Sequence, residues 1–406
     1  MSRAQSADSR VVAAKQIWRR NRCIKESSIA GYQRWVRRFT EYCRLCALHE
    51  CDELTRAGAL KFAQWWHAKY PSFELAHAVR AARCALAAWA FSLRAVGELL
   101  PPWRAPATDR PTSLLAQAFA AYLRDVRGNP PTTIHKKLEH ISKFDLFLRA
   151  RGCGSSVPNL RDIDAFIVAS RDRYARTTVA DICSTLRTYL RFLQVSGRIH
   201  NDLAGSIKAP IVRVSERPHR ALPWQDVQRI LRAVDRTSAC GRRDYALLLM
   251  MSAYGLGAGE IINLSLDSID WQANTVRVVR PKTRVEFLLP LLPTVARALE
   301  SYLRHGRPVH TDTRRLFVTM RVPHKPLASS VTIRHILHSA ARRAGVTATF
   351  LGTHVLRHTH ACRQLELGTE PKLIGDILGH RNPESTSTYL RVATERLREL
   401  ALPVPT

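Results

Sequence analysis

The sequence predicts a mainly α-helical protein in which tandem helical domains are followed by a mixed α/β domain with a small antiparallel sheet. Apolar residues recur at helical spacing through most of the first 200 positions, a proline-rich break interrupts them near residue 101, and one clear pair of strands follows residue 270. We therefore expect five parts: a flexible arm at 1–20, a helical domain at 21–100, a second helical domain at 113–204, a linker at 205–223 and a further domain at 224–406.

The first helical domain begins where the periodicity becomes regular. The apolar residues of its first helix are spaced three and four apart: Ile29, Tyr32, Val36, Phe39 and Tyr42. Two more amphipathic stretches follow at 57–69 and 75–96, and a glycine ends the second. This pattern predicts a small helical bundle.

The second helical domain repeats the plan of the first. Counterparts lie 105 positions on for Ile29, Phe39 and Tyr42 (Ile134, Phe144 and Phe147), and 100 positions on for Leu86, Trp89, Leu93 and Gly97 (Leu186, Tyr189, Leu193 and Gly197). We hypothesise a duplicated helical module, with generic amphipathic periodicity as the alternative.

The chain is strongly basic, with 63 Lys and Arg against 33 Asp and Glu and a formal net charge of +30 at pH 7. Such an excess favours a polyanionic partner whose binding depends on salt. Helix starts rich in hydroxyl and basic residues, at 132–137 and 173–178, suit phosphate contacts, although a solvated basic face would look similar. We expect a nucleic acid as the partner.

Composition also sets the expected compartment. The nine cysteines lack C-x-x-C spacing, which predicts reduced thiols. The first twenty residues lack the apolar core of a signal peptide, and no apolar run reaches the length of a membrane span. We expect a cytoplasmic, nucleoid-associated protein that makes no use of a membrane.

A group of reactive side chains lies between residues 352 and 389. Thr353 reads as a helix cap, so that His354 and Arg357 share one helical face at i and i+3. A glycine stop precedes His380, and Tyr389 follows nine positions later. Two imidazoles, a guanidinium and a phenol suit attack on a phosphodiester, in which cations stabilise the charge that develops on the phosphate.

A zinc pair is the alternative reading of two of these residues. His354 and His358 are separated by four positions, but the Glu expected between them is absent and Arg357 disfavours a bound cation. We expect neither a metal nor a cofactor.

The segments HVLRH and LGHRNPESTSTYLRV resemble the tyrosine recombinase (phage integrase) family, whose signature is H-x-x-R, then L-G-H, then a Tyr nine residues later. The resemblance is close in the C-terminal half and looser in the N-terminal half. It implies double-stranded DNA as the partner, a SAM-like core-binding domain at 113–204 that grips the DNA, and a tyrosine-recombinase catalytic domain at 224–406. The first helical domain would then bind either accessory DNA or another protomer.

The resemblance also implies a role for each site residue. Tyr389 would be the nucleophile that forms a 3′-phosphotyrosyl link. Arg357 and His380 would hold the non-bridging oxygens, and His354 would assist proton transfer from the phenol. Lys282, in the turn of the hairpin expected at 271–292, would protonate the leaving 5′ oxygen.

One family position is altered. The family motif G-L-R-x-x-E-L corresponds here to residues 255–261, where Gly257 stands in place of the first catalytic Arg and Glu260 matches the supporting acid. Losing such a donor typically slows a reaction by about 10²–10³, so we expect reduced activity. The candidates for a substitute cation are Arg280, Arg284, Arg242 and Arg243; the other two alternatives are catalysis by a partner recombinase and DNA binding without cutting.

The resemblance therefore implies a site-specific DNA recombinase or integrase that serves integration or transposition of a mobile element, with a tetramer on DNA as the working unit. The tail at 391–406 would dock on a neighbouring protomer or on its own domain. The alternative function is a catalytically weak DNA-binding subunit beside active partner recombinases, since the chain also resembles recombinases that occur in sets of three. A type IB topoisomerase would share the chemistry.

Overall fold

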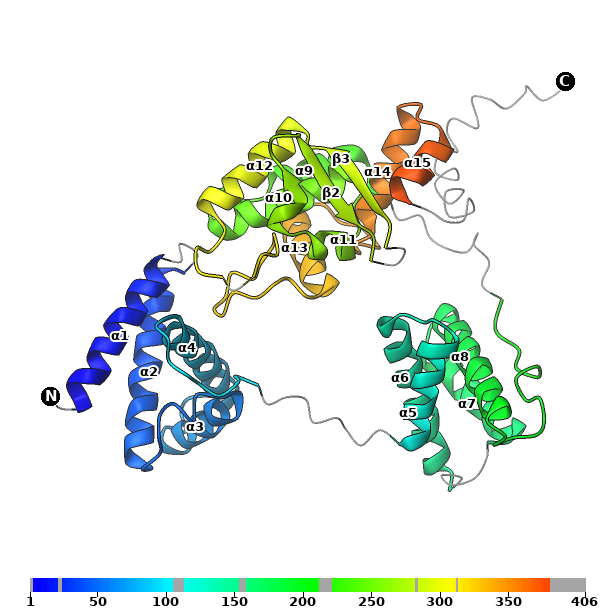
Figure 1. The fold of residues 1–406 in the computed structure, drawn as a ribbon, viewed down its shortest axis with the longest axis horizontal. Helices are drawn as coiled ribbons and strands as arrows, with labels where there is room; N and C mark the ends of the chain where they lie inside the picture. The colour runs from blue at the N-terminus through cyan, green and yellow to red at the C-terminus, as the bar shows by residue number, and fades with distance from the viewer. Residues whose placement is uncertain are drawn as a thin grey trace. The chain divides into compact units, whose positions relative to one another are not determined.

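The computed structural model describes residues 3–20, 24–104, 113–152, 158–211, 221–281, 284–311 and 313–379. The chain divides into two compact units, of which one comprises Met1–Pro106 with His219–Thr406 and the other Ala107–Pro218. Strands occur only in the C-terminal region of the described chain (Figure 1). The expected fold class, mainly helical with a small antiparallel sheet, is confirmed. Within these ranges no helix combines the length and the apolar character that a membrane span requires.

The N-terminal part of the chain folds into helices α1 (Arg3–Arg20), α2 (Glu26–Leu45), α3 (Arg56–Lys69) and α4 (Leu75–Ala95). Their core is rich in aromatic residues. Phe39 and Phe62 meet edge to face with ring centroids 5.5 Å apart, and Trp89 is 1% exposed. The three helices expected between residues 27 and 96 are therefore confirmed.

The structure differs from the flexible arm expected at residues 1–20, because α1 occupies nearly all of this segment. Val11, Ala14 and Trp18 are spaced three and four apart and are buried. The Trp18 indole nitrogen donates to the Ala88 carbonyl at 3.2 Å. The apolar face of α1 is short, with Ile17 and Trp18 as its largest residues, and the charged residues around it weaken the helical pattern in the sequence.

The second unit contains α5 (Leu114–Ala121), a π-helical turn (Tyr122–Val126), α6 (Pro131–Ala150), α7 (Leu160–Arg173) and α8 (Arg176–Val195). Its core is again aromatic and aliphatic, with Phe119 and Phe144 fully or almost fully buried. One polar pair interrupts it: His140 Nδ1 lies 3.3 Å from Thr185 Oγ1. Burial lowers the pKa of His140.

The C-terminal region contains eleven described elements. In chain order they are α9 (Trp224–Arg232), α10 (Ala239–Tyr254), α11 (Ala258–Asn263), a 3₁₀ turn (Leu266–Ser268), β1 (Ile269–Asp270), β2 (Thr275–Val279), β3 (Glu286–Pro290), α12 (Pro293–His305), α13 (Ser330–Arg343), α14 (Val355–Glu366) and α15 (Pro371–Leu378).

The sheet is antiparallel with the order β1-β2-β3. Val276 pairs with Leu289, and Val278 pairs with Phe287. Val276 and Val278 point into the core and are fully buried, as alternation along a strand requires. The hairpin expected at 271–292 is confirmed, and β1, a strand of two residues, adds an edge that the sequence does not predict.

The candidate site lies where helices α10 and α14 approach each other closely. Helix α10 ends at Gly255, whose φ is +63° and where a Cβ would lie 2.8 Å from Cδ2 of His360. Glycine therefore permits both the left-handed turn and the contact with α14. His360 Nδ1 lies 3.1 Å from the Ser252 carbonyl, and burial lowers the pKa of His360, which favours the neutral ring. The first turn of α14 consequently lies beside the turn between α10 and α11.

Candidate active site

Arg357, in the first turn of α14, is held by three acceptors. Its Nη1 donates to Glu260 Oε2 at 3.3 Å and to the Gly255 carbonyl at 3.1 Å, while Nη2 donates to the Leu378 carbonyl. The side chains of Arg357 and Glu260 are 14% and 9% exposed. The structure thus brings together two predicted site residues, the arginine and the acid expected to support the site, although 97 positions separate them in the chain.

Glu260 also organises the altered position. Its Oε2 accepts the Gly257 N–H at 2.7 Å, and Gly257 is the N-cap of α11. Gly257 has φ −78°, which any residue can adopt. A Cβ at this position would meet Glu260 Oε2 at 3.5 Å and Arg357 Nη1 at 4.0 Å, both ordinary contact distances. The backbone therefore does not require glycine here, and a side chain at 257 would start beside Arg357.

Arg280 is a second buried guanidinium in this region. It follows the last residue of β2, is 6% exposed, and donates to the carbonyls of Ile377 and Leu378. Its Cζ lies 4.4 Å from the centroid of the Phe287 ring. Burial lowers the pKa of Arg280, Glu260 opposes that shift and Arg357 adds to it. Arg280 and Arg357 therefore share one acceptor, the Leu378 carbonyl at the end of α15.

The other three candidate cations are engaged elsewhere or lie in the hairpin turn. Arg243 pairs with Asp244 at 2.6 Å and donates to the Val318 carbonyl at 3.1 Å. Arg242 donates to the His305 carbonyl at 3.4 Å. Arg284 has φ +56° and its N–H donates to the Arg280 carbonyl at 2.8 Å. Among the four candidates, only Arg280 has its guanidinium bonded to an acceptor that Arg357 also uses.

His354 lies one residue before α14, where it is the N-cap and makes no side-chain capping bond. The expectation that Thr353 caps this helix is therefore wrong by one residue. His354 still has helical backbone angles, φ −82° and ψ −8°, and its carbonyl accepts the His358 N–H at 2.9 Å. The i and i+3 relation between His354 and Arg357 is kept.

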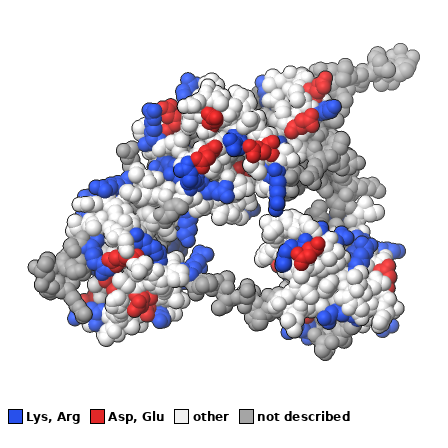
Figure 2. Space-filling view, viewed as in Figure 1, with Lys and Arg blue, Asp and Glu red and all other residues white. Residues whose placement is uncertain are grey.

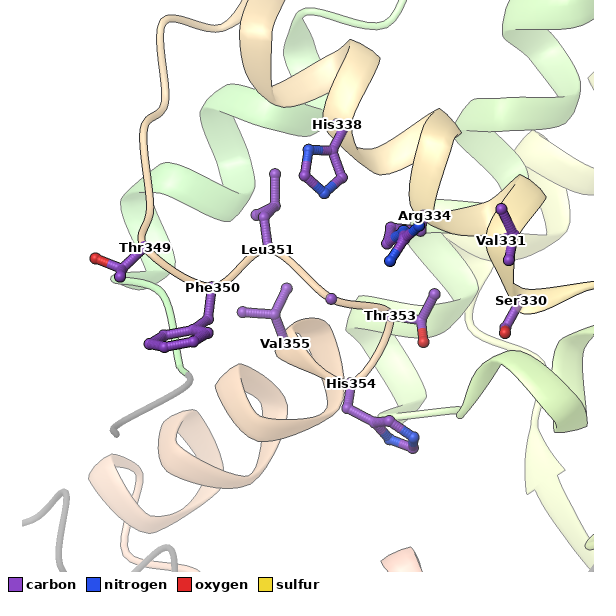
Figure 3. A pocket seen from close by; sticks show the side chains of 11 residues that line it. Ser330, Val331, Arg334, His338, Thr349, Phe350, Leu351, Thr353, His354 and Val355 are labelled. Atoms are coloured by element: carbon purple, nitrogen blue, oxygen red, sulfur yellow. The ribbon is translucent and has the colours of Figure 1, made fainter. Parts of the chain in front are cut away.

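His354 also lines a cavity of about 440 Å³ between α13 and the segment 349–355 (Figure 3). Arg334 and His338, separated by one helical turn on α13, line the same cavity. Neither Arg334 nor His338 was among the residues predicted from the sequence. Their spacing in the run TIRHILH is a visible signal, but it is typical of any basic helix surface.

Three predicted site residues, Lys282, His380 and Tyr389, lie outside the described residues, as does the tail at 391–406. The described part of the site therefore consists of Arg357, Glu260, Gly257, Arg280 and His354. Across the described ranges, groups of three or more His, Cys, Asp or Glu suited to a metal ion do not occur.

Comparison with known proteins gives two family matches. Residues 220–396 match the profile described as the phage integrase family, and residues 116–197 match the one described as the phage integrase, N-terminal SAM-like domain. Among solved structures, a lambda integrase (75–356) dimer bound to a COC′ core site has a TM-score of 0.52 at 20% identity and covers 68% of this chain and 93% of that one. The XerH recombinase bound to palindromic difH has a TM-score of 0.54 at 13% identity, with coverage of 73% and 97%. These structural likenesses show the fold.

Sequence relatives decide the family. The putative integrase/recombinase y4rA of Sinorhizobium fredii is 33% identical over 71% of this chain and 70% of its own length. The tyrosine recombinase XerC of Oceanobacillus iheyensis is 30% identical over 70% of this chain and 94% of its own length. Since both matches are at least 30% identical and cover more than two thirds of the relative, the chain belongs to the phage integrase family.

Proposed function

We propose that this protein is a site-specific DNA recombinase that cuts and rejoins duplex DNA through a 3′-phosphotyrosine link at Tyr389, for integration or transposition of a mobile element. The observation that carries the proposal is the buried pair of Arg357 and Glu260, which fixes a guanidinium beside the end of α15, directly before His380 in the chain. Membership of the phage integrase family supports the reaction class.

The reaction needs no external energy source. The Tyr389 oxygen attacks phosphorus and gives its proton to His354, and the bond to the 5′ oxygen breaks as Lys282 protonates that oxygen. Arg357 and His380 stabilise the charge on the non-bridging oxygens. The 5′ hydroxyl of a partner strand then attacks the phosphotyrosine and releases the phenol. One phosphodiester is broken and one is formed.

We propose that Arg280 supplies the guanidinium that the family's first catalytic arginine would provide at position 257. Arg280 lies close enough to Arg357 for both guanidinium groups to donate to the Leu378 carbonyl. The negative charge of Glu260 also favours the charged form of Arg280 and opposes the lowering of its pKa by burial. A guanidinium stays protonated at neutral pH even when burial lowers its pKa. A phosphate oxygen is a stronger, charge-assisted acceptor than a carbonyl. Bound DNA would therefore exchange these backbone acceptors for phosphate.

The second candidate function is a DNA-binding subunit that acts with active partner recombinases. The observation that favours it is the room beside Gly257, which allows an arginine that this chain lacks. In this case Arg280 would stabilise the end of α15 and take no part in catalysis.

Covalent capture tests both candidates. Purified protein would be mixed with nicked duplexes from the two ends of the mobile element that carries the gene, and adducts would be resolved on a denaturing gel. The proteins compared would be wild type, Tyr389→Phe, Gly257→Arg, Arg280→Gln and, as a matched hairpin control, Arg284→Gln.

We expect an adduct in wild type and none in Tyr389→Phe. Arg280→Gln should slow adduct formation by about 10²–10³, as the loss of one oxyanion donor does, whereas Arg284→Gln should leave the rate nearly unchanged. If only Gly257→Arg forms an adduct, the protein is the binding subunit. Adduct in Tyr389→Phe would mean that the nucleophile is misassigned.

Double-stranded DNA is the proposed partner, with four protomers as the working unit, either alone or together with other recombinases. The structures that resemble this chain include a DNA-bound integrase dimer and a DNA-bound recombinase. Basic side chains outnumber acidic ones on the face drawn in Figure 2, in line with the net charge of +30. We also propose domains at 113–204 and 224–406, and a place on the nucleoid in the cytoplasm. Because Trp18 of α1 is buried in the core formed with α2–α4, we propose that the first domain, expected at 21–100, begins with α1.

A further inference from the structure

Helices α1–α4 and α5–α8 share one plan. Helices α2 and α6 each contain 20 residues, α3 and α7 each contain 14, and α4 and α8 contain 21 and 20. The spacing between counterparts is 105 positions for α2 and α6, 104 for α3 and α7, and 101 falling to 100 along α4 and α8. The loops between these helices therefore differ by only one to three residues. Amphipathic periodicity explains helical segments, but it does not explain why three successive helices match in length and in order.

The buried positions correspond as well. At a spacing of 105, buried residues of α1 and α2 match buried residues of the other set: Ala14 with Phe119, Trp18 with Leu123, Ile29 with Ile134, Val36 with Ile141 and Phe39 with Phe144. At a spacing of 100, Leu86, Trp89 and Leu93 of α4 match Leu186, Tyr189 and Leu193 of α8. Trp35 and Ala85 occupy the positions of the polar pair His140 and Thr185, so a large and a small apolar residue replace two polar ones.

The helix caps are the third correspondence. The Thr55 side chain accepts the Gly58 N–H at 3.0 Å before α3, and the Asn159 side chain accepts the Asp162 N–H at 2.9 Å before α7. Both sets end at a glycine of positive φ, Gly97 at +92° and Gly197 at +69°. Residues 116–197, in the second set, match the SAM-like domain. The first set is therefore a second copy of that module.

One surface feature is common to the two copies. Tyr174, directly after α7, is 37% exposed, and Nζ of Lys143 lies 5.4 Å from its ring centroid. The counterpart Tyr70, directly after α3, is 42% exposed, and its ring lies 4.3 Å from that of Trp66. Arg38, the counterpart of Lys143, has its Cζ 4.2 Å from the Trp66 ring centroid. Each copy therefore exposes a tyrosine beside a cation of the preceding long helix.

A basic residue precedes each tyrosine. Lys69 lies directly before Tyr70, with Nζ 5.9 Å from its ring centroid, and Arg173 lies directly before Tyr174. We refer to Arg38, Lys69 and Tyr70 as the Tyr70 surface and to Lys143, Arg173 and Tyr174 as the Tyr174 surface. Cations beside an exposed aromatic hydroxyl suit the phosphate and sugar edge of a duplex, an interaction that does not depend on sequence.

We infer that the first copy binds a second stretch of double-stranded DNA through the Tyr70 surface, so that one chain binds duplex DNA with two copies of the same module. This inference rests on the proposed function, because it takes the SAM-like copy at 113–204 to be a DNA-binding domain. The two copies differ in charge at one helical position. Gly31 stands where the second copy has Lys136, and a Cβ on Gly31 would meet open space.

The salt dependence of DNA binding reports how many phosphates the protein neutralises and needs no knowledge of the target sequence. The experiment would use the full-length chain and a fluorescein-labelled, mixed-sequence duplex of about 60 base pairs, with affinity measured by anisotropy between about 50 and 200 mM KCl. Four variants would be compared with wild type: Arg38→Gln with Lys69→Gln, Lys143→Gln with Arg173→Gln, Gly31→Lys, and the control Arg44→Gln with Arg94→Gln. The control removes the same charge from the last turns of α2 and α4.

Each of the first two variants should reduce the slope of log K against log salt by about 1 for every phosphate that the protein no longer neutralises. Gly31→Lys should raise the slope by about 1, and the control should leave it unchanged. Because Gly31→Lys adds a side chain at an open helical position, it tests the inference even if Arg38→Gln perturbs the stack on Trp66.

The inference is overturned if changes on the Tyr70 surface alter the slope no more than the control does while the Tyr174 variant lowers it; the proposed function would then stand. An unchanged slope in the Tyr174 variant as well would instead remove the DNA interaction that we propose for the SAM-like domain.

Discussion

The Arg357 guanidinium binds one carboxylate and two backbone carbonyls that come from three separate segments. Glu260, the carboxylate, also accepts the Gly257 N–H and so joins the N-terminus of α11 to α14. Both side chains are largely buried, and removing one charge of such a pair leaves the other uncompensated. The pair therefore serves the fold and the proposed chemistry at once.

Replacement of Glu260 by Gln separates charge from hydrogen bonding at this position. The amide oxygen still accepts the Gly257 N–H, but it no longer balances Arg357, so Glu260→Gln should lower the free energy of unfolding by about 1–3 kcal/mol. Urea unfolding followed by circular dichroism measures the change. Glu41→Gln, which removes an exposed partner of Arg44, is the control and should have no measurable effect. Equal effects of the two substitutions would contradict this account of Glu260.

Buried imidazoles make stability depend on pH. Burial lowers the pKa of His140 in the folded state, so the unfolded chain binds its proton first as pH falls below about 6.5. Stability is therefore present above that pH and is lost between it and the lower folded pKa. His140→Leu with Thr185→Val, which makes the pair apolar as in the first copy, should weaken the fall in melting temperature between about pH 7.5 and 5.5. A steeper fall of the melting temperature in the double variant would contradict a lowered pKa of His140 in the folded state.

At the scale of the elements, helix caps act locally and alike in the two copies. Thr55→Ala and Asn159→Ala each remove one side-chain acceptor from a helix N-terminus, and each should cost about 1 kcal/mol of stability. Lys25, the N-cap of α2, makes no side-chain capping bond, so Lys25→Ala is the matched control and should be close to neutral. Chemical denaturation of the three variants tests the comparison, and a large effect of Lys25→Ala would count against it.

Regular elements could be predicted from the sequence because their information is local. The spacing of Ile29, Val36 and Phe39 predicted α2, and alternating valines predicted β2. Helix α1 was missed because its apolar face is short and lies among charged residues. The contact of Arg280 with the end of α15 spans 97 and 98 positions and depends on the packing of the hairpin, so no local pattern contains it. The family resemblance named Arg357 and Glu260 as separate site residues, and their pairing, across 97 positions, was not predicted.

At the scale of the whole molecule, the chain has separate hydrophobic cores. One core lies in the helices of the N-terminal part, a second belongs to the unit Ala107–Pro218, and a third surrounds α10. Domains with their own cores unfold in separate steps more often than in one. The duplicated helical module places equivalent phenylalanines in two of these cores, which gives a matched pair of probes.

Phe39 and Phe144 are those probes, with exposed fractions of 0% and 1%. Phe144→Ala should lower the free energy of unfolding of the unit Ala107–Pro218 by about 3–5 kcal/mol. For a domain of this size, that change should lower the melting temperature by roughly 10 °C or more. Phe39→Ala should leave that transition in place and shift a different one. Differential scanning calorimetry of the full chain distinguishes the two patterns. If both substitutions moved every transition together, the unit would not unfold independently, and the equivalence of the two copies would have to be tested within one cooperative fold.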